Sequence, residues 1–163
     1  MTAKDNASIA AELDRLVAAF FSAVSFETGS APTYDAIRDL FIAQGLLIKN
    51  VSSTPEICSI DTFIAPRRAL VASGALTRFN EVELSHTNDI FGNVAQRLSV
   101  YAKSGVQNGT AFEARGVTFT QFISTPEGWR ISAMAWDDER PGLVVPSSAE
   151  QAQLRFGLLG RRS

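Results

Sequence analysis

The sequence predicts an α+β fold in which N-terminal helices pack on a strongly curved antiparallel sheet. Two observations carry this prediction: an apolar stripe at helical spacing near the N-terminus, and two long hairpins over residues 76–138. Helices followed by a meander of strands are typical of the α+β class. The 163 residues suit one domain, residues 1–163, with a core over about 8–138 and a peripheral tail over 141–163, where a short helix is expected near Ser148.

The first helix is predicted from residue 8 to about residue 25. Its apolar residues recur three or four positions apart, which places them on one face of a helix. A proline follows the pattern at Pro32 and disfavours helical backbone in the residue before it. The stripe consists of Ile9, Leu13, Leu16, Val17, Phe20, Phe21 and Val24.

A second helix is predicted to begin at Thr33, whose hydroxyl suits an N-cap, and to end at Gly45, which suits a C-terminal cap. Asp35 in its first turn complements the helix dipole. Residues 46–48 are then predicted to form a short strand.

A third helix is predicted from Asp61, as its N-cap, to Ser73, with Gly74 after it. Pro66 falls inside this span and lacks a backbone N–H. The helix is therefore expected either to begin at this proline or to kink there.

The first hairpin is predicted from strands over 76–89 and 93–103, joined by a three-residue loop that ends at Gly92. This register sorts an apolar inward face from a polar outward face that carries Glu81, Glu83, Ser85, Arg97, Ser99 and Tyr101. Tyr101 is accordingly expected on the outside or at an interface. The predicted inward pairs are Val82 with Val100, Leu84 with Leu98, and His86 with Gln96.

The second hairpin is predicted around the loop Pro126-Glu127-Gly128, where proline leads a turn and glycine ends it. Asn108-Gly109 is the turn signal that separates the two hairpins. The predicted pairs are Ile123 with Ile131, Gln121 with Ala133, Phe119 with Ala135, and Arg115 with Glu139.

Composition excludes several classes of function. A net charge of −2 and the absence of long basic runs argue against nucleic-acid binding, which needs clustered lysine and arginine. Cys58 is the single cysteine and is expected to be a small buried hydrophobe. No phosphate-binding loop, zinc-ligand spacing or membrane-spanning run is present, so we expect no cofactor, no metal and no membrane partner. Without a leader-like segment, the expected compartment is the cytoplasm.

The order of elements resembles the nuclear transport factor 2-like superfamily, and within it the SnoaL-like domains. Two local stretches add to this resemblance: residues 40–47, and Gly116 spaced before Gly128-Trp129-Arg130-Ile131. The resemblance covers roughly residues 8–138. It implies a cone-shaped, cystatin-like α+β barrel with a pocket between helices and sheet, and a homodimer formed through the sheet. It leaves function open, because the group contains both enzymes and binding modules.

Four polar residues on the predicted inward face are the candidate ligand-binding residues: His86, Gln96, Gln121 and Arg115. His86 is the only imidazole and could act as an acid or base near neutral pH. A surface ion pair between Arg115 and Glu139 is the alternative to an inward Arg115 that holds a substrate carboxylate. The acidic run over residues 137–139 cannot converge on one metal ion, since neighbours in a strand point to opposite faces, and it is expected to be a solvated terminus.

Three hypotheses about function remain open at this point. The first is a SnoaL-like domain that binds an unidentified small molecule in its pocket. The second is an enzyme of the isomerase, cyclase or dehydratase type that uses His86 as acid or base. The third is a non-catalytic protein-interaction module, which predicts a pocket filled by phenylalanine and leucine and a large exposed apolar patch.

Overall fold

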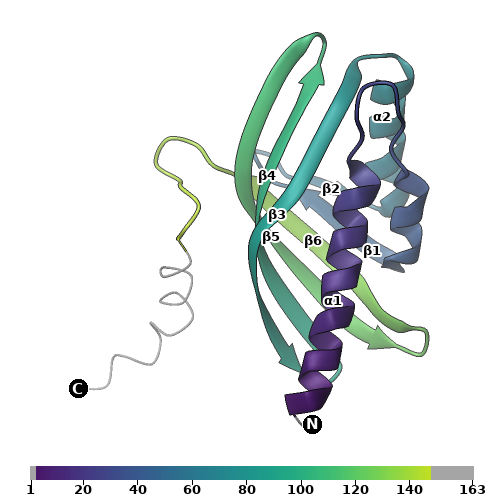
Figure 1. Cartoon of the computed structure of the whole chain (residues 1–163), viewed down its shortest axis with the longest axis vertical. Helices are drawn as coiled ribbons and strands as arrows, with labels where there is room; N and C mark the ends of the chain where they lie inside the picture. Colours follow the sequence, from purple (N-terminus) through teal and green to yellow (C-terminus); the bar gives the residue numbers. More distant parts are fainter. Residues whose placement is uncertain (1–2, 148–163) are drawn as a thin grey trace.

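The computed structural model describes residues 3–147 and has two layers, with the helices on one face of a curved six-stranded sheet (Figure 1). The helical layer contains α1 (Ala3–Val24), the 3₁₀ helix η1 (Tyr34–Asp39) and α2 (Ile60–Ala72). The short helix expected near residue 148 lies outside the described residues. Within residues 3–147, no helix combines the length and the apolar content that a membrane crossing requires.

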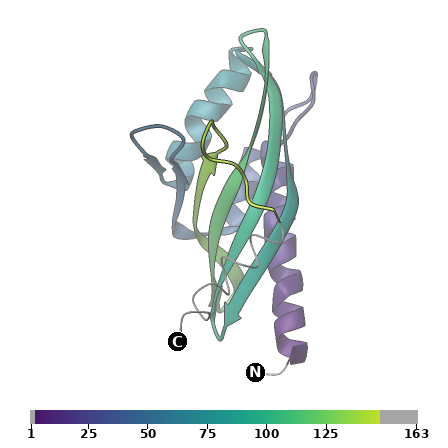
Figure 2. The same cartoon turned by 90° about the vertical axis from the view of Figure 1, so that its left-hand side faces the viewer.

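The sheet has the order β2-β1-β6-β5-β4-β3, and only the pair β1 with β6 is parallel. The α+β prediction is therefore confirmed. Figure 2 shows the sheet from its other side, with the helices behind it and the segment after β6 in front. The strands are β1 (Phe41–Lys49), β2 (Glu56–Cys58), β3 (Leu76–Phe91), β4 (Val94–Gln107), β5 (Thr110–Thr125) and β6 (Gly128–Asp138).

The apolar stripe of α1 forms the centre of the core, as its spacing predicts. Leu13 and Leu16 are completely buried, and Phe20 packs against the rings of Phe41 and Phe63. This helix therefore joins β1 and α2 through aromatic contacts. Burial of such side chains contributes roughly 1.5–3 kcal/mol each, which makes the stripe the main source of stability for this layer.

The second predicted helix is wrong beyond its first turns. The 3₁₀ helix ends at Asp39, and β1 runs from Phe41 through Gly45, so Gly45 caps no helix. Tertiary pairing overrides local propensity here, because Ile131 of β6 donates its N–H to the carbonyl of Leu40 at 2.8 Å and aligns β1 beside it. The predicted strand over 46–48 is confirmed as part of β1.

The third predicted helix is confirmed as α2, with a different cap. Ser59, not Asp61, is the N-cap, and its hydroxyl accepts the N–H of Thr62 at 3.2 Å. The helix continues through Pro66 rather than beginning at it. Gly74 follows with a φ of 75°, a left-handed conformation that glycine adopts without strain.

The predicted register of the first hairpin is wrong. The turn contains only Gly92 and Asn93, because Phe91 pairs with Val94. Gly92 has a φ of 58°, as the first position of a tight II′ hairpin turn requires. The two-residue turn makes His86 pair with Ser99 instead of Gln96. A bulge between Glu83 and Ser85 then shifts the pairs before it, so that Val82 pairs with Ala102 instead of Val100.

The turn and the bulge together exchange the faces of most of the hairpin. Val82 and Leu84 are 46% and 51% exposed on the outer face, whereas Arg97, Ser99 and Tyr101 are buried toward the helices. The expected outer position of Tyr101 is therefore wrong. The turn reverses the faces of β4 relative to β3, because the partner of His86 moves three positions, from Gln96 to Ser99. The bulge then reverses β3 before it, so that Val82 points outward whereas His86 stays on the side of Arg97.

The second hairpin is confirmed in part. Gln121 pairs with Ala133 and Phe119 with Ala135, as predicted, but Ile131 pairs with Phe122 instead of Ile123 because a bulge intervenes. The turn is the two residues between Thr125 and Gly128. Phe122 points into the core, whereas Gln121 and Phe119 are exposed, so the inward face predicted for this hairpin is also wrong.

Gly116, one of the residues behind the family resemblance, has a steric role. A Cβ atom at this position would lie 2.2 Å from the Tyr101 hydroxyl and 2.2 Å from the Asp137 carbonyl oxygen. Only glycine therefore lets the tyrosine side chain cross β5 to reach β6. The Tyr101 hydroxyl hydrogen-bonds with the carboxylate of Asp138 there, so this residue of the acidic run points inward and is not a solvated terminus.

Candidate functional site

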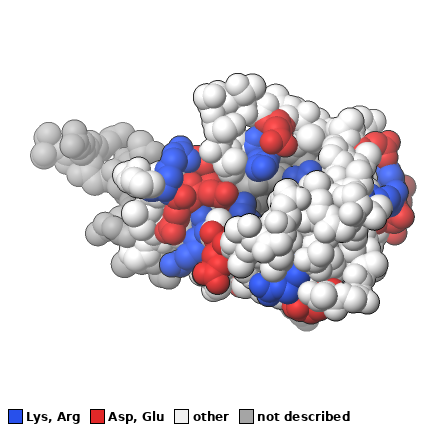
Figure 3. All heavy atoms as spheres, turned by 90° about the horizontal axis from the view of Figure 1, so that it is seen from above, with Lys and Arg blue, Asp and Glu red and all other residues white. Residues whose placement is uncertain are grey.

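A cavity of about 330 Å³ lies between α1, α2 and the inner face of the sheet. Most of its wall is apolar, from helices and strands alike, and five of its side chains are ionisable at ordinary pH. The molecule is hollowed on the face shown in Figure 3, where acidic and basic side chains surround the hollow. The charged lining residues are Lys49, Glu56, Arg67, Glu81 and Lys103, and the apolar ones include Phe21, Phe63, Phe79, Phe112 and Trp136.

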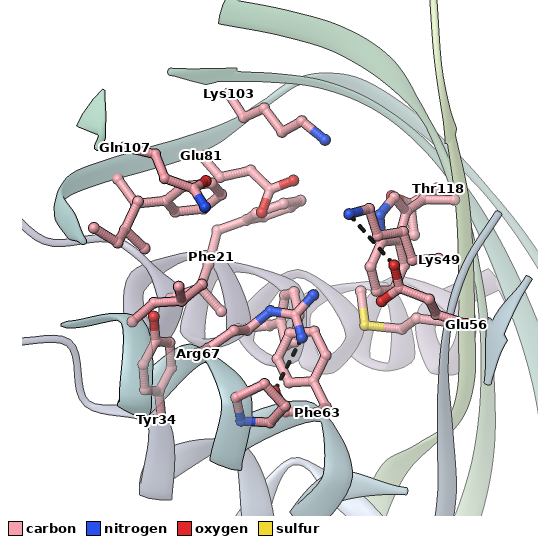
Figure 4. Close-up of a pocket in the computed structure, with 18 of the residues that line it drawn as sticks. Phe21, Tyr34, Lys49, Glu56, Phe63, Arg67, Glu81, Lys103, Gln107 and Thr118 are labelled. Carbon is pink, nitrogen blue, oxygen red and sulfur yellow. Dashed lines mark hydrogen bonds and ion pairs between the residues drawn. The ribbon is translucent and has the colours of Figure 1, made fainter. Parts of the chain in front are cut away.

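Glu81 of β3 directs its carboxyl group into this cavity (Figure 4). Its backbone is fixed by Ser25, whose hydroxyl accepts the Glu81 N–H at 3.0 Å. Its carboxyl group, in contrast, makes no hydrogen bond or ion pair with any residue of the range 3–147. Burial is the largest cause that raises the pKa of Glu81 from 4.5 to about 7, although the nearby cations Lys103 and Arg67 oppose it.

Lys103 of β4 and Lys49 of β1 are cations that already have partners. The Lys103 ammonium lies 2.8 and 2.9 Å from the two carboxylate oxygens of Asp138. Lys49 lies 3.7 Å from Glu56. The Lys103 pair is largely buried and therefore satisfies a charge that would otherwise be costly, whereas the Lys49 pair is a partly exposed ion pair.

Arg67 of α2 differs from both lysines. Its guanidinium group lies 3.7 Å from the centre of the Phe63 ring, one turn earlier in the helix, and donates one hydrogen bond of 3.0 Å to the Phe63 carbonyl. Among the described residues, no carboxylate forms an ion pair with it. Burial is the largest influence on this group and lowers the pKa of Arg67.

The cavity therefore presents a carboxyl group and a guanidinium group that do not pair with each other. The carboxyl group can accept or donate a proton near neutral pH, since its pKa lies close to 7. The guanidinium can donate several parallel hydrogen bonds to a planar anion. Figure 4 shows both groups directed toward the same space, with Phe21 and Phe63 beside them.

The four residues predicted from the sequence do not line this cavity. His86 is 38% exposed in its side chain and lies at an open hollow against α1, with Nδ1 3.0 Å from Glu83 and Nε2 3.6 Å from Asp14. Its predicted partner Gln96 is exposed and donates to Asp89 at 3.1 Å. Whether His86 exchanges a proton with a ligand stays a prediction.

The structure brings only two of the four together. The Gln121 amide donates to the Gln96 amide oxygen at 3.4 Å on the outer face of the sheet. Arg115 lies with Glu139 beside a separate outer hollow, and the backbone N–H of Glu139 donates to the Arg115 carbonyl at 2.7 Å. A role of these residues in ligand binding stays a prediction.

Sequence reasoning missed Glu81 and Arg67. Glu81 was assigned to the outer face because the bulge after Glu83 leaves no mark in the sequence. Arg67 carries one usable signal, its position four residues after Phe63, which places a cation over a ring on one helix face. Across the described part of the chain, histidine, cysteine, aspartate and glutamate nowhere gather in a group that could hold a metal ion.

Comparison with known proteins identifies the fold. No family model matches the chain, and no curated protein matches it in sequence. Solved structures do. An NTF2-like superfamily protein from Salmonella enterica serovar Typhimurium superposes with a TM-score of 0.67 at 12% identity, over 83% of this chain and 94% of that one. An NTF2-like protein with a cystatin-like fold from Novosphingobium aromaticivorans gives 0.63 at 19% identity, over 92% and 91%.

The chain has the NTF2-like fold. A provisionally assigned scytalone dehydratase from Novosphingobium aromaticivorans shares it, with a TM-score of 0.66 at 10% identity over 85% of this chain and 89% of that one. At such identities the likeness extends to the NTF2-like architecture and not to the residues of a site. The function must therefore be argued from the cavity itself.

Proposed function

We propose that this NTF2-like chain binds a small organic molecule in the cavity and that Glu81 exchanges a proton with a carbon acid of that molecule. One observation carries the proposal: a carboxyl group points into a mostly apolar cavity and has no hydrogen-bond or ion-pair partner among residues 3–147. A structural carboxylate would be paired, as Glu83 is with Arg97. An unpaired one is available to a ligand.

The proposed chemistry depends on the pKa of the Glu81 carboxyl group. A general base works best when its pKa lies near the working pH, because it is then both ionised and basic enough to remove a proton. The pKa of Glu81, about 7, meets this condition, and the apolar wall around it would strengthen its interaction with a polarised substrate. Isomerisation and dehydration are the reaction types that such a base supports.

This proposal moves the acid–base role from His86 to Glu81. His86 is held between Glu83 and Asp14 at an open hollow, outside the cavity. The cavity is also not filled by phenylalanine and leucine, as a protein-interaction module would require. The SnoaL-like subtype, a cytoplasmic location and a homodimer through the outer sheet face, where Val82, Leu84 and Phe119 are exposed, stay predictions.

Solvent exchange tests the proposal. The protein is incubated in D₂O with a panel of cyclic and unsaturated ketones, with and without a carboxylate substituent, and loss of the α-proton signal is followed by NMR. We expect catalysed exchange with at least one compound, and a fall of roughly a hundredfold or more in Glu81→Gln. His86→Gln is the matched control and should retain the exchange rate. Absence of exchange with the whole panel, or equal rates in Glu81→Gln, contradicts the proposal.

A further inference from the structure

Arg67 is the cation of the cavity that forms no ion pair with a carboxylate of the described residues. Lys103 is paired with Asp138, and Lys49 with Glu56. Arg67 donates only to the backbone carbonyl of Phe63 within the described residues. The cavity thus contains one cationic group whose remaining donors are not used by the fold.

The guanidinium group is also held in a defined orientation. Its Cζ atom lies over the Phe63 ring, 3.7 Å from the ring centre, and its bond to the Phe63 carbonyl fixes one edge. Stacking uses the face of the guanidinium and leaves the N–H groups of its plane free to donate. Figure 4 shows this group at the floor of the cavity, on the opposite wall from Lys103.

Such an arrangement costs free energy in the empty protein. Burial disfavours the charged form of Arg67, and no ion pair offsets that cost. A ligand anion that entered the cavity would supply the missing partner at a site where water competes little. The interaction would then be stronger than a surface ion pair.

We propose that Arg67 binds a carboxylate group of the ligand, so that the substrate class is a ring-bearing carboxylic acid. This inference rests on the proposed function in taking the cavity as the ligand site. A planar guanidinium matches a carboxylate with two parallel hydrogen bonds. A phosphate dianion fits less well, because the two lysines are engaged and the acidic side chains Glu56 and Glu81 share the same space.

The rest of the wall defines the remainder of the ligand. The rings of Phe21, Phe79 and Trp136 and the side chain of Leu70 line the cavity, which is suited to an apolar ring system. The carboxylate would therefore lie at the α2 wall and the ring against the sheet. Glu81, across the cavity from Arg67, would face a carbon of the ring rather than the carboxylate.

Paired probes test this inference. Binding of 1-naphthoate and of its neutral isostere 1-naphthamide is measured by calorimetry to the wild type, Arg67→Met and Arg68→Met. Arg68 is the next residue of α2, carries the same charge and pairs with Asp35 at 2.8 Å outside the cavity. We expect naphthoate affinity to fall about tenfold or more in Arg67→Met and to be unchanged in Arg68→Met.

Naphthamide serves as the internal control for folding, and its affinity should be the same in all three proteins. Equal affinity of the wild type for naphthoate and naphthamide overturns the inference, as does an equal loss in Arg68→Met. The two proposals fail separately. If Glu81→Gln loses solvent exchange while Arg67→Met keeps naphthoate affinity, only the carboxylate class is wrong. If Arg67→Met loses naphthoate while Glu81→Gln retains exchange, only the proton transfer is wrong.

Discussion

The side chains of Arg97 and Arg67 both lie between the helices and the sheet, yet they differ in the partners that the protein gives them. Arg97 of β4 is 2% exposed and donates to Glu83 of β3, to Asp14 of α1 at 2.6 Å and to Asn88 at 3.4 Å. Arg67 of α2 donates, among residues 3–147, only to a backbone carbonyl. One guanidinium is saturated by the protein, and the other is not.

The pKa values of the two groups follow this difference. Burial opposes the charge of Arg97, but its hydrogen bonds to Glu83 and Asp14 outweigh that effect and raise its pKa. Burial prevails at Arg67 and lowers its pKa. A buried charge with a complete set of partners joins elements of the fold, whereas one without them is available to a ligand. The comparison therefore separates a structural arginine from a binding one.

The largest expected effect is the loss of the structural arginine. Arg97→Met should destabilise the protein by about 3 kcal/mol, because Glu83, which is 16% exposed, would keep its charge without its main partner. Urea unfolding at pH 7 measures the change. Arg38→Met, which removes an exposed ion pair with Asp61, is the control. If Arg97→Met lowers the free energy of unfolding by less than Arg38→Met, the Arg97 network does not stabilise the fold.

Glu81→Gln should give a smaller and pH-dependent effect. The folded protein holds its Glu81 proton up to a pKa of about 7, whereas the unfolded chain releases it near 4.5, so stability falls as pH rises between these values. Removing the carboxylate should therefore stabilise the protein by about 2 kcal/mol at pH 8 and have no such effect at pH 4.

Urea unfolding of Glu81→Gln at both pH values measures this dependence. Glu113→Gln, which changes an exposed carboxylate of β5, is the matched control and should show no such dependence. A Glu81→Gln gain that is equal at pH 4 and pH 8 would contradict the raised pKa.

The smallest effect is expected at the binding arginine. Arg67→Met should change the free energy of unfolding by less than about 1 kcal/mol, since the lost contact with Phe63 is offset by relief of an uncompensated charge. Thermal and urea unfolding beside Arg97→Met provide the measurement. A loss as large as that of Arg97→Met would show that Arg67 is structural and would remove the contrast between the two.

Local patterns in the sequence predicted most of the helices and strands but not the site. The stripe of α1, the span of α2 and the turns at Asn108-Gly109 and after Thr125 all depend on neighbours within a few residues. The site depends on which face of β3 Glu81 occupies. That face follows from the two-residue turn at Gly92 and the bulge after Glu83. Neither feature alters the alternation of apolar and polar residues in the sequence, so neither could be predicted from it.

The sequence by itself determined the fold class, the order of the long helices and of the four-stranded meander, and the supply of apolar side chains for one core. Only the tertiary structure decided which charged residues became partners. Arg97 meets Asp14 across 83 positions of the chain, whereas Arg67 and Glu81 form no ion pair with any described residue. Helix and turn formation are governed by short-range sterics and spacing, whereas the pairing of charges depends on strand register and on how α2 packs over the sheet.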